Sequence, residues 1–160
     1  MKKHTLIAEP GSNAFTLTRT FDAPRELVFK TMTDPKLIPQ WWGPKDYTTV
    51  VATMDVRPGG GWRFVQKGPD GSEYGFFGFF HQIEAPSRVV QTFEFEGMPG
   101  HVLMETMILE ERDGKTLFTD ISVFQTVEDR DGMIASGMEH GFSDSMEQLE
   151  ALIEAARVAR

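Results

Sequence analysis

The sequence contains no cysteine. Disulfide bonds, thiolate nucleophiles and thiolate-based metal sites are therefore excluded. A chain without disulfides suits a reducing compartment, so we expect a cytoplasmic location.

Basic residues are also scarce, because 16 lysines and arginines stand against 24 acidic residues and give a formal net charge of −8. A surface of that sign repels phosphate groups. We therefore expect neither nucleic acid nor an anionic membrane as a partner.

Long apolar runs are missing as well. The apolar stretch within residues 1–13 is too short for the core of a signal peptide, and no window approaches the roughly 18 apolar residues of a membrane helix. We expect a soluble protein that is neither exported nor inserted into a membrane.

Several catalytic signatures are absent too. There is no HExxH pattern and no GxSxG nucleophile elbow, and the loop at residues 58–61 lacks the lysine and hydroxyl residue of a phosphate-binding loop. The four histidines, His4, His81, His101 and His140, have no metal-ligand spacing. The sequence thus predicts no metal and no cofactor.

Length and composition favour one domain. The 160 residues are 40% hydrophobic, and neither a repeat nor a long linker divides them. We expect a single domain over residues 1–160, with an ordered core from about 13 to 157.

The chain begins and ends with helix signals that flank a block of strands. Alternation predicts a strand over residues 12–21, and two short helices follow, one through Leu27, Val28 and Met32 after an N-cap candidate at Asp22, the other over residues 36–42. Six segments rich in β-branched and aromatic residues come next, separated by short turns. They predict an antiparallel meander, with segments at residues 47–56, 61–67, 73–83, 88–96, 101–111 and 116–126.

After Thr126 the apolar period changes to about 3.6, which predicts a long helix. Its apolar stripe consists of Met138, Phe142, Met146, Leu149, Ile153 and Ala156. The order of elements indicates an α+β fold in which a curved antiparallel sheet wraps the C-terminal helix.

The last two strands form a hairpin whose register can be inferred. Asp113-Gly114 is a two-residue turn signal, so Arg112 should oppose Lys115. One face then carries His101, Leu103, Glu105, Met107, Leu109, Phe118, Asp120, Ser122 and Phe124. Charge alone places this face in solvent; the alternative places it inward, where burial would raise the carboxyl pKa values.

Four stretches, at residues 21–44, 55–64, 78–95 and 128–152, resemble the bacterial proteins named after the activator of heat-shock-protein-90 ATPase, which belong to the SRPBCC (START-like) superfamily. The resemblance implies a helix-grip fold with a deep cavity between the sheet and the C-terminal helix. Superfamily members bind lipids, polyketides, steroids or plant hormones there, and a minority are enzymes. The chain lacks the additional N-terminal domain of a full co-chaperone, so chaperone activation is the less favoured expectation.

The resemblance also bears on the hairpin, since similar sequences carry aliphatic residues at the positions of Met107, Leu109 and Phe118. This implies that Glu105, Asp120 and also His101 face the cavity.

Our main hypothesis is a binding module for a small, largely hydrophobic molecule. Gln91, a lone amide among apolar residues, needs a hydrogen-bond partner and is a candidate ligand contact. The expected ligand-binding residues are Trp42, Trp62, Phe64, Phe80, Gln91, Phe93, His101, Glu105, Phe118, Asp120, Met138 and Phe142.

Two alternatives remain open. A cyclase or hydrolase would use Glu105 or Asp120 for proton transfer with His101 as a helper. A third reading is an interaction domain that acts on a chaperone.

Phe77 and Phe79 lie on the face of their strand opposite Phe76 and Phe80, so one pair covers the outer face or a homodimer contact.

Overall fold

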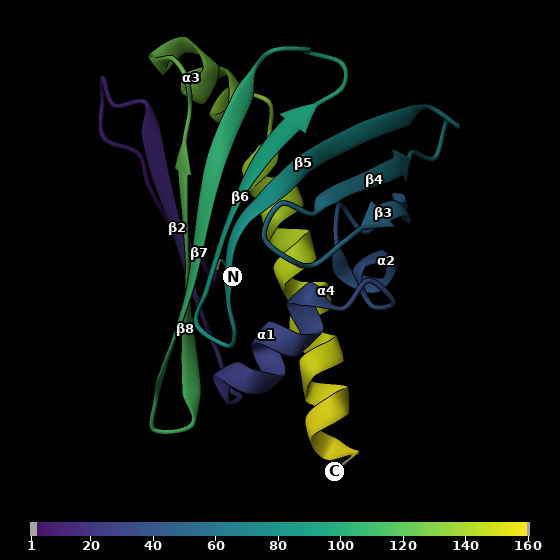
Figure 1. The fold of residues 1–160 in the computed structure, drawn as a ribbon, viewed down its shortest axis with the longest axis vertical. Helices are drawn as coiled ribbons and strands as arrows, with labels where there is room; N and C mark the ends of the chain where they lie inside the picture. Colours follow the sequence, from purple (N-terminus) through teal and green to yellow (C-terminus); the bar gives the residue numbers. More distant parts are fainter. Residues whose placement is uncertain (1–2, 160) are drawn as a thin grey trace.

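The computed structural model describes residues 3–159. Its centre is an eight-stranded antiparallel sheet in the order β1-β2-β8-β7-β6-β5-β4-β3. From β3 to β8 each strand pairs with the next, which confirms the meander of six strands (Figure 1). The strands are β1 (Thr5–Ile7), β2 (Ala14–Phe21), β3 (Thr48–Met54), β4 (Gly61–Lys67), β5 (Glu73–Glu84), β6 (Arg88–Phe95), β7 (Val102–Arg112) and β8 (Lys115–Val123).

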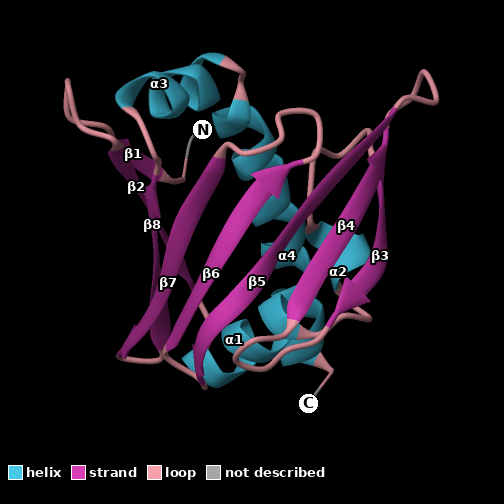
Figure 2. Ribbon diagram, turned by 45° about the horizontal axis from the view of Figure 1, so that its top comes forward, coloured by secondary structure: helices cyan, strands magenta, loops and turns pink. Residues whose placement is uncertain are grey.

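Four helices complete the fold: α1 (Arg25–Thr33), α2 (Ile38–Trp41), α3 (Val127–Ala135) and α4 (Met138–Val158). In Figure 2, α1, α2 and α4 lie on one side of the curved sheet, and α4 crosses it obliquely. The structure therefore confirms the α+β helix-grip fold. The helix α4 packs on the sheet because one side of it is apolar, and Met146, Leu149 and Ile153 on that side are buried.

Two elements were not predicted. β1 is only three residues long and pairs with Thr16–Thr18 of β2, so its alternation was too short to recognise. α3 precedes α4 and is separated from it by Gly137, whose φ of 84° is left-handed. The two short helices consequently lie between the second and third strands.

The start of α1 differs from the prediction. Pro24, not Asp22, is the N-cap residue, and its side chain makes no capping hydrogen bond. The backbone N–H of Arg25 instead donates to Glu111 Oε1 at the end of β7, across 2.8 Å. A residue distant in sequence thus performs the capping.

The register of the last hairpin is as predicted. Asp113 and Gly114 have φ values of 54° and 77°, the left-handed pair that a two-residue hairpin turn requires. Arg112 opposes Lys115, and Leu109 opposes Phe118. The turn fixes which side chains of β7 and β8 share a face.

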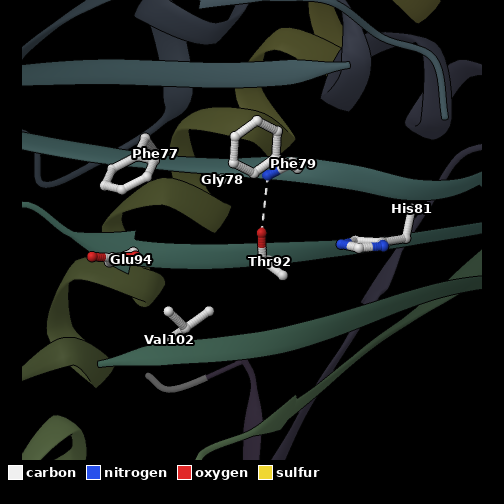
Figure 3. A pocket seen from close by; sticks show the side chains of 7 residues that line it. All are labelled: Phe77, Gly78, Phe79, His81, Thr92, Glu94 and Val102. Atoms are coloured by element: carbon white, nitrogen blue, oxygen red, sulfur yellow. Dashed lines mark hydrogen bonds between the residues drawn. The ribbon is translucent and has the colours of Figure 1, made fainter. Parts of the chain in front are cut away.

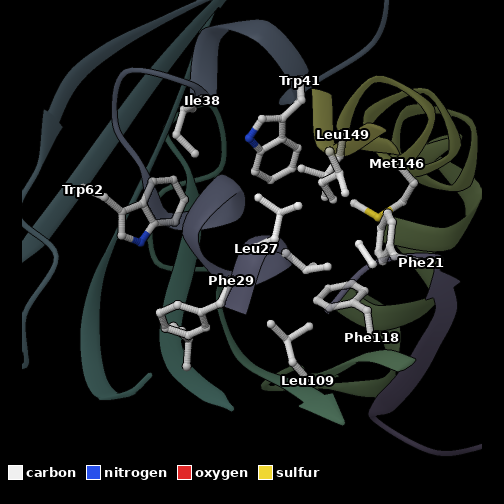
Figure 4. Close-up of a cluster of buried hydrophobic side chains, with 14 of the residues drawn as sticks. Phe21, Leu27, Phe29, Ile38, Trp41, Trp62, Leu109, Phe118, Met146 and Leu149 are labelled. Carbon is white, nitrogen blue, oxygen red and sulfur yellow. The ribbon is translucent and has the colours of Figure 1, made fainter. Parts of the chain in front are cut away.

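The core lies between the concave face of the sheet and the helices α1, α2 and α4 (Figure 4). A smaller cluster forms around Phe15 and Phe124 at the end of the sheet near α3. Phe142 of α4 packs against both clusters.

Polar side chains tie α4 to the rest of the fold. Arg19 of β2 is buried and donates to the carbonyl oxygen of Met146 across 2.8 Å. On the other side, Gln148 Nε2 donates to the carbonyl oxygens of Trp41 and Gly43 across 3.1 and 2.9 Å. The backbone N–H of Gly43 donates to Ser145 Oγ across 2.8 Å. These bonds satisfy the carbonyls and the N–H at the end of α2, which would otherwise be costly to bury.

Candidate functional site

The concave face of the sheet carries a band of polar side chains, here called the inner polar band: Gln91, Glu105, Asp120 and Ser122. Glu105 stands opposite Gln91 on one side and opposite Ser122 on the other. Asp120 lies two residues before Ser122 on β8 and stands opposite Met107 of β7. The face that charge alone would have placed in solvent is therefore the buried one.

Hydrogen bonds link the members of this band. Gln91 Nε2 donates to Glu105 Oε1 across 3.1 Å, and Ser122 Oγ lies 3.3 Å from Asp120 Oδ1, to which it donates. Asp120 is only 7% exposed, whereas Glu105 is half-buried. The predicted need of Gln91 for a polar partner is met by Glu105.

The two carboxyl groups interact electrostatically. Burial raises the pKa of Glu105, and hydrogen bonds from Asp120 and Gln91 oppose that rise. Burial also raises the pKa of Asp120 well above its ordinary value, and the negative charge of Glu105 raises it further. The two carboxyl groups therefore hold a proton more readily than separate, exposed carboxyl groups would.

No cation of the described chain pairs with either carboxyl group. Arg19, on the neighbouring strand β2, is a candidate by position, but its guanidinium contacts Met146 and Glu150 instead. The carboxyl groups of Glu105 and Asp120 therefore have no positively charged partner among the described residues.

Aromatic residues flank the band, and many of the expected ligand contacts meet there. The ring centroids of Trp62 and Phe93 are 5.8 Å apart, and those of Trp62 and Phe64 are 4.8 Å apart. Trp42 meets Phe64 edge-on at 5.1 Å. Phe80 belongs to the same buried cluster. The predicted lining residues of β4, β5 and β6 are therefore neighbours in the fold.

The expected contacts from α4 and β8 divide between two places. Phe142 stacks on Phe118 with centroids 6.5 Å apart, which brings α4 to the hairpin strand that carries Asp120. Met138 packs against the smaller cluster around Phe15 and Phe124. Met138 therefore lies toward the end of the sheet near α3.

Burial is uneven across the concave face. Phe118 and Leu149 are 1% and 0% exposed, respectively. Phe93, Glu105 and Met107 face the same interior, yet they are only half-buried. The interior is consequently less tightly covered along β6 and the adjoining part of β7 than it is near α1.

Two buried donors have no hydrogen-bond partner among the described residues, the indole N–H groups of Trp41 and Trp62. Trp62 Nε1 lies over Gly78 of β5, only 2.8 Å from where a Cβ on that glycine would be. The absent side chain at Gly78 therefore makes room for the indole. The unpaired N–H was not predicted from the sequence.

His101 does not join the carboxyl pair, so its predicted inward orientation is wrong. It precedes β7 at the rim of the sheet, where its side chain is 51% exposed, and its Nδ1 lies 2.9 Å from Asp129 Oδ1 of α3. His101 lies before the first residue of β7, so the alternation of side chains along that strand does not determine which way it points.

The larger of the two best-defined hollows lies on the convex face of the sheet, not beside the inner polar band. Its volume is about 280 Å³, and Figure 3 shows it between β5 and β6. Phe79, which is 53% exposed, and Phe77 form one side of it, as the alternation of β5 predicted for the outward pair. The other lining residues are Gly78, His81, Thr92, Glu94 and Val102.

The second hollow is much smaller. It lies where His4 and Arg19 meet Met146 of α4 and has a volume of about 10 Å³. That is room for a single water molecule.

The described residues contain no group of three or more metal-ligating side chains. Among the helices that the structure describes, none is long and apolar enough to cross a membrane.

Comparison with known families matches residues 22–154 to the model of the Activator of Hsp90 ATPase homolog 1-like protein. The chain belongs to this family. The match spans α1 to most of α4 and so includes the whole inner polar band. The family lies in the SRPBCC superfamily, as the sequence had indicated.

Solved structures of similar proteins support the assignment of the fold. A protein from Arthrobacter aurescens is 28% identical with a TM-score of 0.86, covering 94% of this chain and 91% of that one. A Staphylococcus epidermidis protein, also 28% identical, has a TM-score of 0.80 and covers 95% and 94%. An AHSA1 protein from Silicibacter pomeroyi shares the fold at 22% identity, with a TM-score of 0.73 and coverage of 89% and 99%. No curated protein matches the sequence.

Proposed function

We propose that this member of the Activator of Hsp90 ATPase homolog 1-like family binds a small, largely apolar molecule between the concave face of the sheet and α4. The observation that carries the proposal is the incomplete burial of inward-facing residues: Phe93, Glu105 and Met107 face the interior and are only half-buried. Well-packed cores leave few such side chains accessible.

The composition of this region also supports a binding site. Ligand sites are mostly apolar and carry a few polar groups that orient the ligand. Trp62, Phe93 and Phe142 supply apolar surface here, and the inner polar band supplies the orienting groups. A cysteine-free chain suits such a role in the reducing cytoplasm, which we propose as its location.

Acid-base catalysis is a second candidate, favoured by the raised pKa values of Glu105 and Asp120. The proposed helper His101 is at the rim of the sheet, however, paired with Asp129. Because this helper lies away from the pair, binding is the simpler function.

Native mass spectrometry of the protein purified from its own host tests the proposal by detecting a co-purified small molecule. The matched variants are Met107→Phe and Met104→Phe. Met107 is inward and half-buried, whereas Met104, on the opposite face of the same strand, is exposed. We expect the first variant to lose the bound mass and the second to retain it.

A wild-type protein that carries no additional mass and binds no hydrophobic probe would contradict the proposal. The same holds if Met107→Phe, shown to be folded by circular dichroism, keeps the ligand as well as Met104→Phe does.

A further inference from the structure

The acidity of the inner polar band points to the chemical class of the ligand. This inference rests on the proposed binding function and concerns the same site. Glu105 and Asp120 lie on one face of adjacent strands, and Gln91 is a neutral donor to Glu105. A buried carboxylate is costly unless a cation or several hydrogen bonds compensate it.

The fold offers a cation nearby but directs it elsewhere. Arg19 shares the concave face, on the strand next to β8, and its guanidinium contacts Met146 and Glu150 of α4 instead of the carboxyl pair. The pair is thus left without a compensating charge from the described chain. This arrangement suits a positive charge that comes from outside.

A second, independent feature also indicates a missing partner. Trp62 is 3% exposed, and its indole N–H is buried with no acceptor among residues 3–159. It lies on the concave face over Gly78, which is two residues before Phe80 on β5, and Phe80 stands opposite Gln91 on β6. An unsatisfied donor therefore lies on the same face as the acidic pair, on β4, three strands across the sheet from Glu105.

The surroundings favour an organic cation over a metal ion. Two carboxyl groups are the only acidic groups of the inner polar band, and the described residues hold no cluster of three metal ligands. The rings of Trp62 and Phe93 lie close by, and aromatic faces attract ammonium groups. The net charge of −8 adds a long-range attraction for cations.

We propose that the ligand is an apolar amine, whose protonated nitrogen donates to Glu105 and Asp120 and whose apolar body lies against the aromatic rings. An oxygen acceptor on the ligand would take the indole N–H of Trp62.

The test compares three probes with the same alkyl chain, decylamine, decanol and decanoate, by isothermal titration calorimetry at pH 7. A charge-assisted hydrogen bond in a buried site is worth roughly a 10- to 100-fold change in affinity. We expect decylamine to bind more tightly than decanol by that factor, and decanoate to bind most weakly.

The variants are Glu105→Gln and Asp120→Asn, with Glu110→Gln as the control. Glu110 is an exposed glutamate on the same strand, so the control removes the same charge outside the site. Glu105→Gln should reduce the affinity for decylamine at least tenfold and leave that for decanol unchanged. Asp120→Asn should act in the same direction, and Glu110→Gln should bind like the wild type.

A fourth probe, 10-aminodecanamide, carries a carbonyl oxygen at the end of the alkyl chain away from the amine, because Trp62 lies three strands across the sheet from Glu105. It should bind more tightly than decylamine, and Trp62→Phe should abolish that difference.

The outcomes separate the two proposals. If none of the probes binds, the proposed binding function fails. If decanol or decanoate binds as tightly as decylamine, or if Glu105→Gln keeps the preference for the amine, the binding function stands and the amine assignment is overturned.

Discussion

Gln91 and Glu105 stand opposite each other on β6 and β7, and the amide nitrogen donates to the carboxylate across 3.1 Å. The bond is formed inside the fold, on the face that the helix α4 covers. It leaves Glu105 held in place without neutralising its charge. The inner polar band is therefore an ordered acidic site, and its acidity has consequences for stability.

The first prediction concerns pH. Because the pKa values of Glu105 and Asp120 are raised, the folded protein binds more protons than the unfolded chain at any pH between the ordinary and the raised values. The contribution of the pair to the free energy of unfolding should therefore fall as the pH rises through this window. Asp120→Asn should remove much of this fall and should stabilise the protein by roughly 1–3 kcal/mol at pH 8.

Urea unfolding of both proteins from pH 5 to pH 8 measures this difference. Subtracting one curve from the other cancels exposed acids such as Glu96 and Glu147, whose pKa values are lowered by Arg63 and Lys45. A difference that does not change with pH would show that Asp120 is ionised throughout.

The second prediction concerns two glycines of β5. A Cβ at Gly78 would lie 1.9 Å from the backbone oxygen of Thr92, whereas at Gly75 it would meet only the side chain of Glu96. Backbone cannot move aside as a flexible side chain can. Gly78→Ala should therefore cost about 2 kcal/mol or more in chemical denaturation. Gly75→Ala should cost clearly less, and equal losses would contradict the argument.

The third prediction concerns Arg19. Its guanidinium is buried and donates to the carbonyl oxygen of Met146, so Arg19→Met would leave that oxygen without this donor. We expect a loss of about 2–3 kcal/mol in the free energy of unfolding. Arg157→Met removes an exposed ion pair with Glu154 and should change stability by less than about 0.5 kcal/mol.

The fourth prediction concerns the attachment of α2 to α4. Gln148 donates to the carbonyl oxygens of Trp41 and Gly43, so Gln148→Ala should loosen α2. Trp41 is buried, and its fluorescence should shift to longer wavelength as water reaches the indole. Glu154→Ala, an exposed change on the same helix, should leave the emission unaltered. An unshifted spectrum for Gln148→Ala would mean that apolar packing alone holds α2.

The order of the elements, the antiparallel meander and the apolar stripe of α4 could all be predicted from the sequence, because each depends on local periodicity. The turn at Asp113-Gly114 even fixed the pairing of β7 with β8, since a two-residue turn allows one register. β1 and the cap of α1 could not be predicted. Both depend on partners that are distant in the chain, β2 for the strand and Glu111 for the N–H of Arg25.

The features of the candidate site also separate into those that the sequence predicts and those that depend on the tertiary structure. The sequence by itself determined that Glu105 and Asp120 share a face, because side chains alternate along a strand. It could not choose the face from charge, since the covering helix decides which side of the sheet is dry. The resemblance to known sequences predicted that the pair faces inward, and the tertiary structure confirmed this for Glu105 and Asp120. Only the tertiary structure placed His101 at the rim and turned Arg19 toward Met146. These arrangements depend on how α4 crosses the sheet, and that crossing is set by packing between residues far apart in the chain.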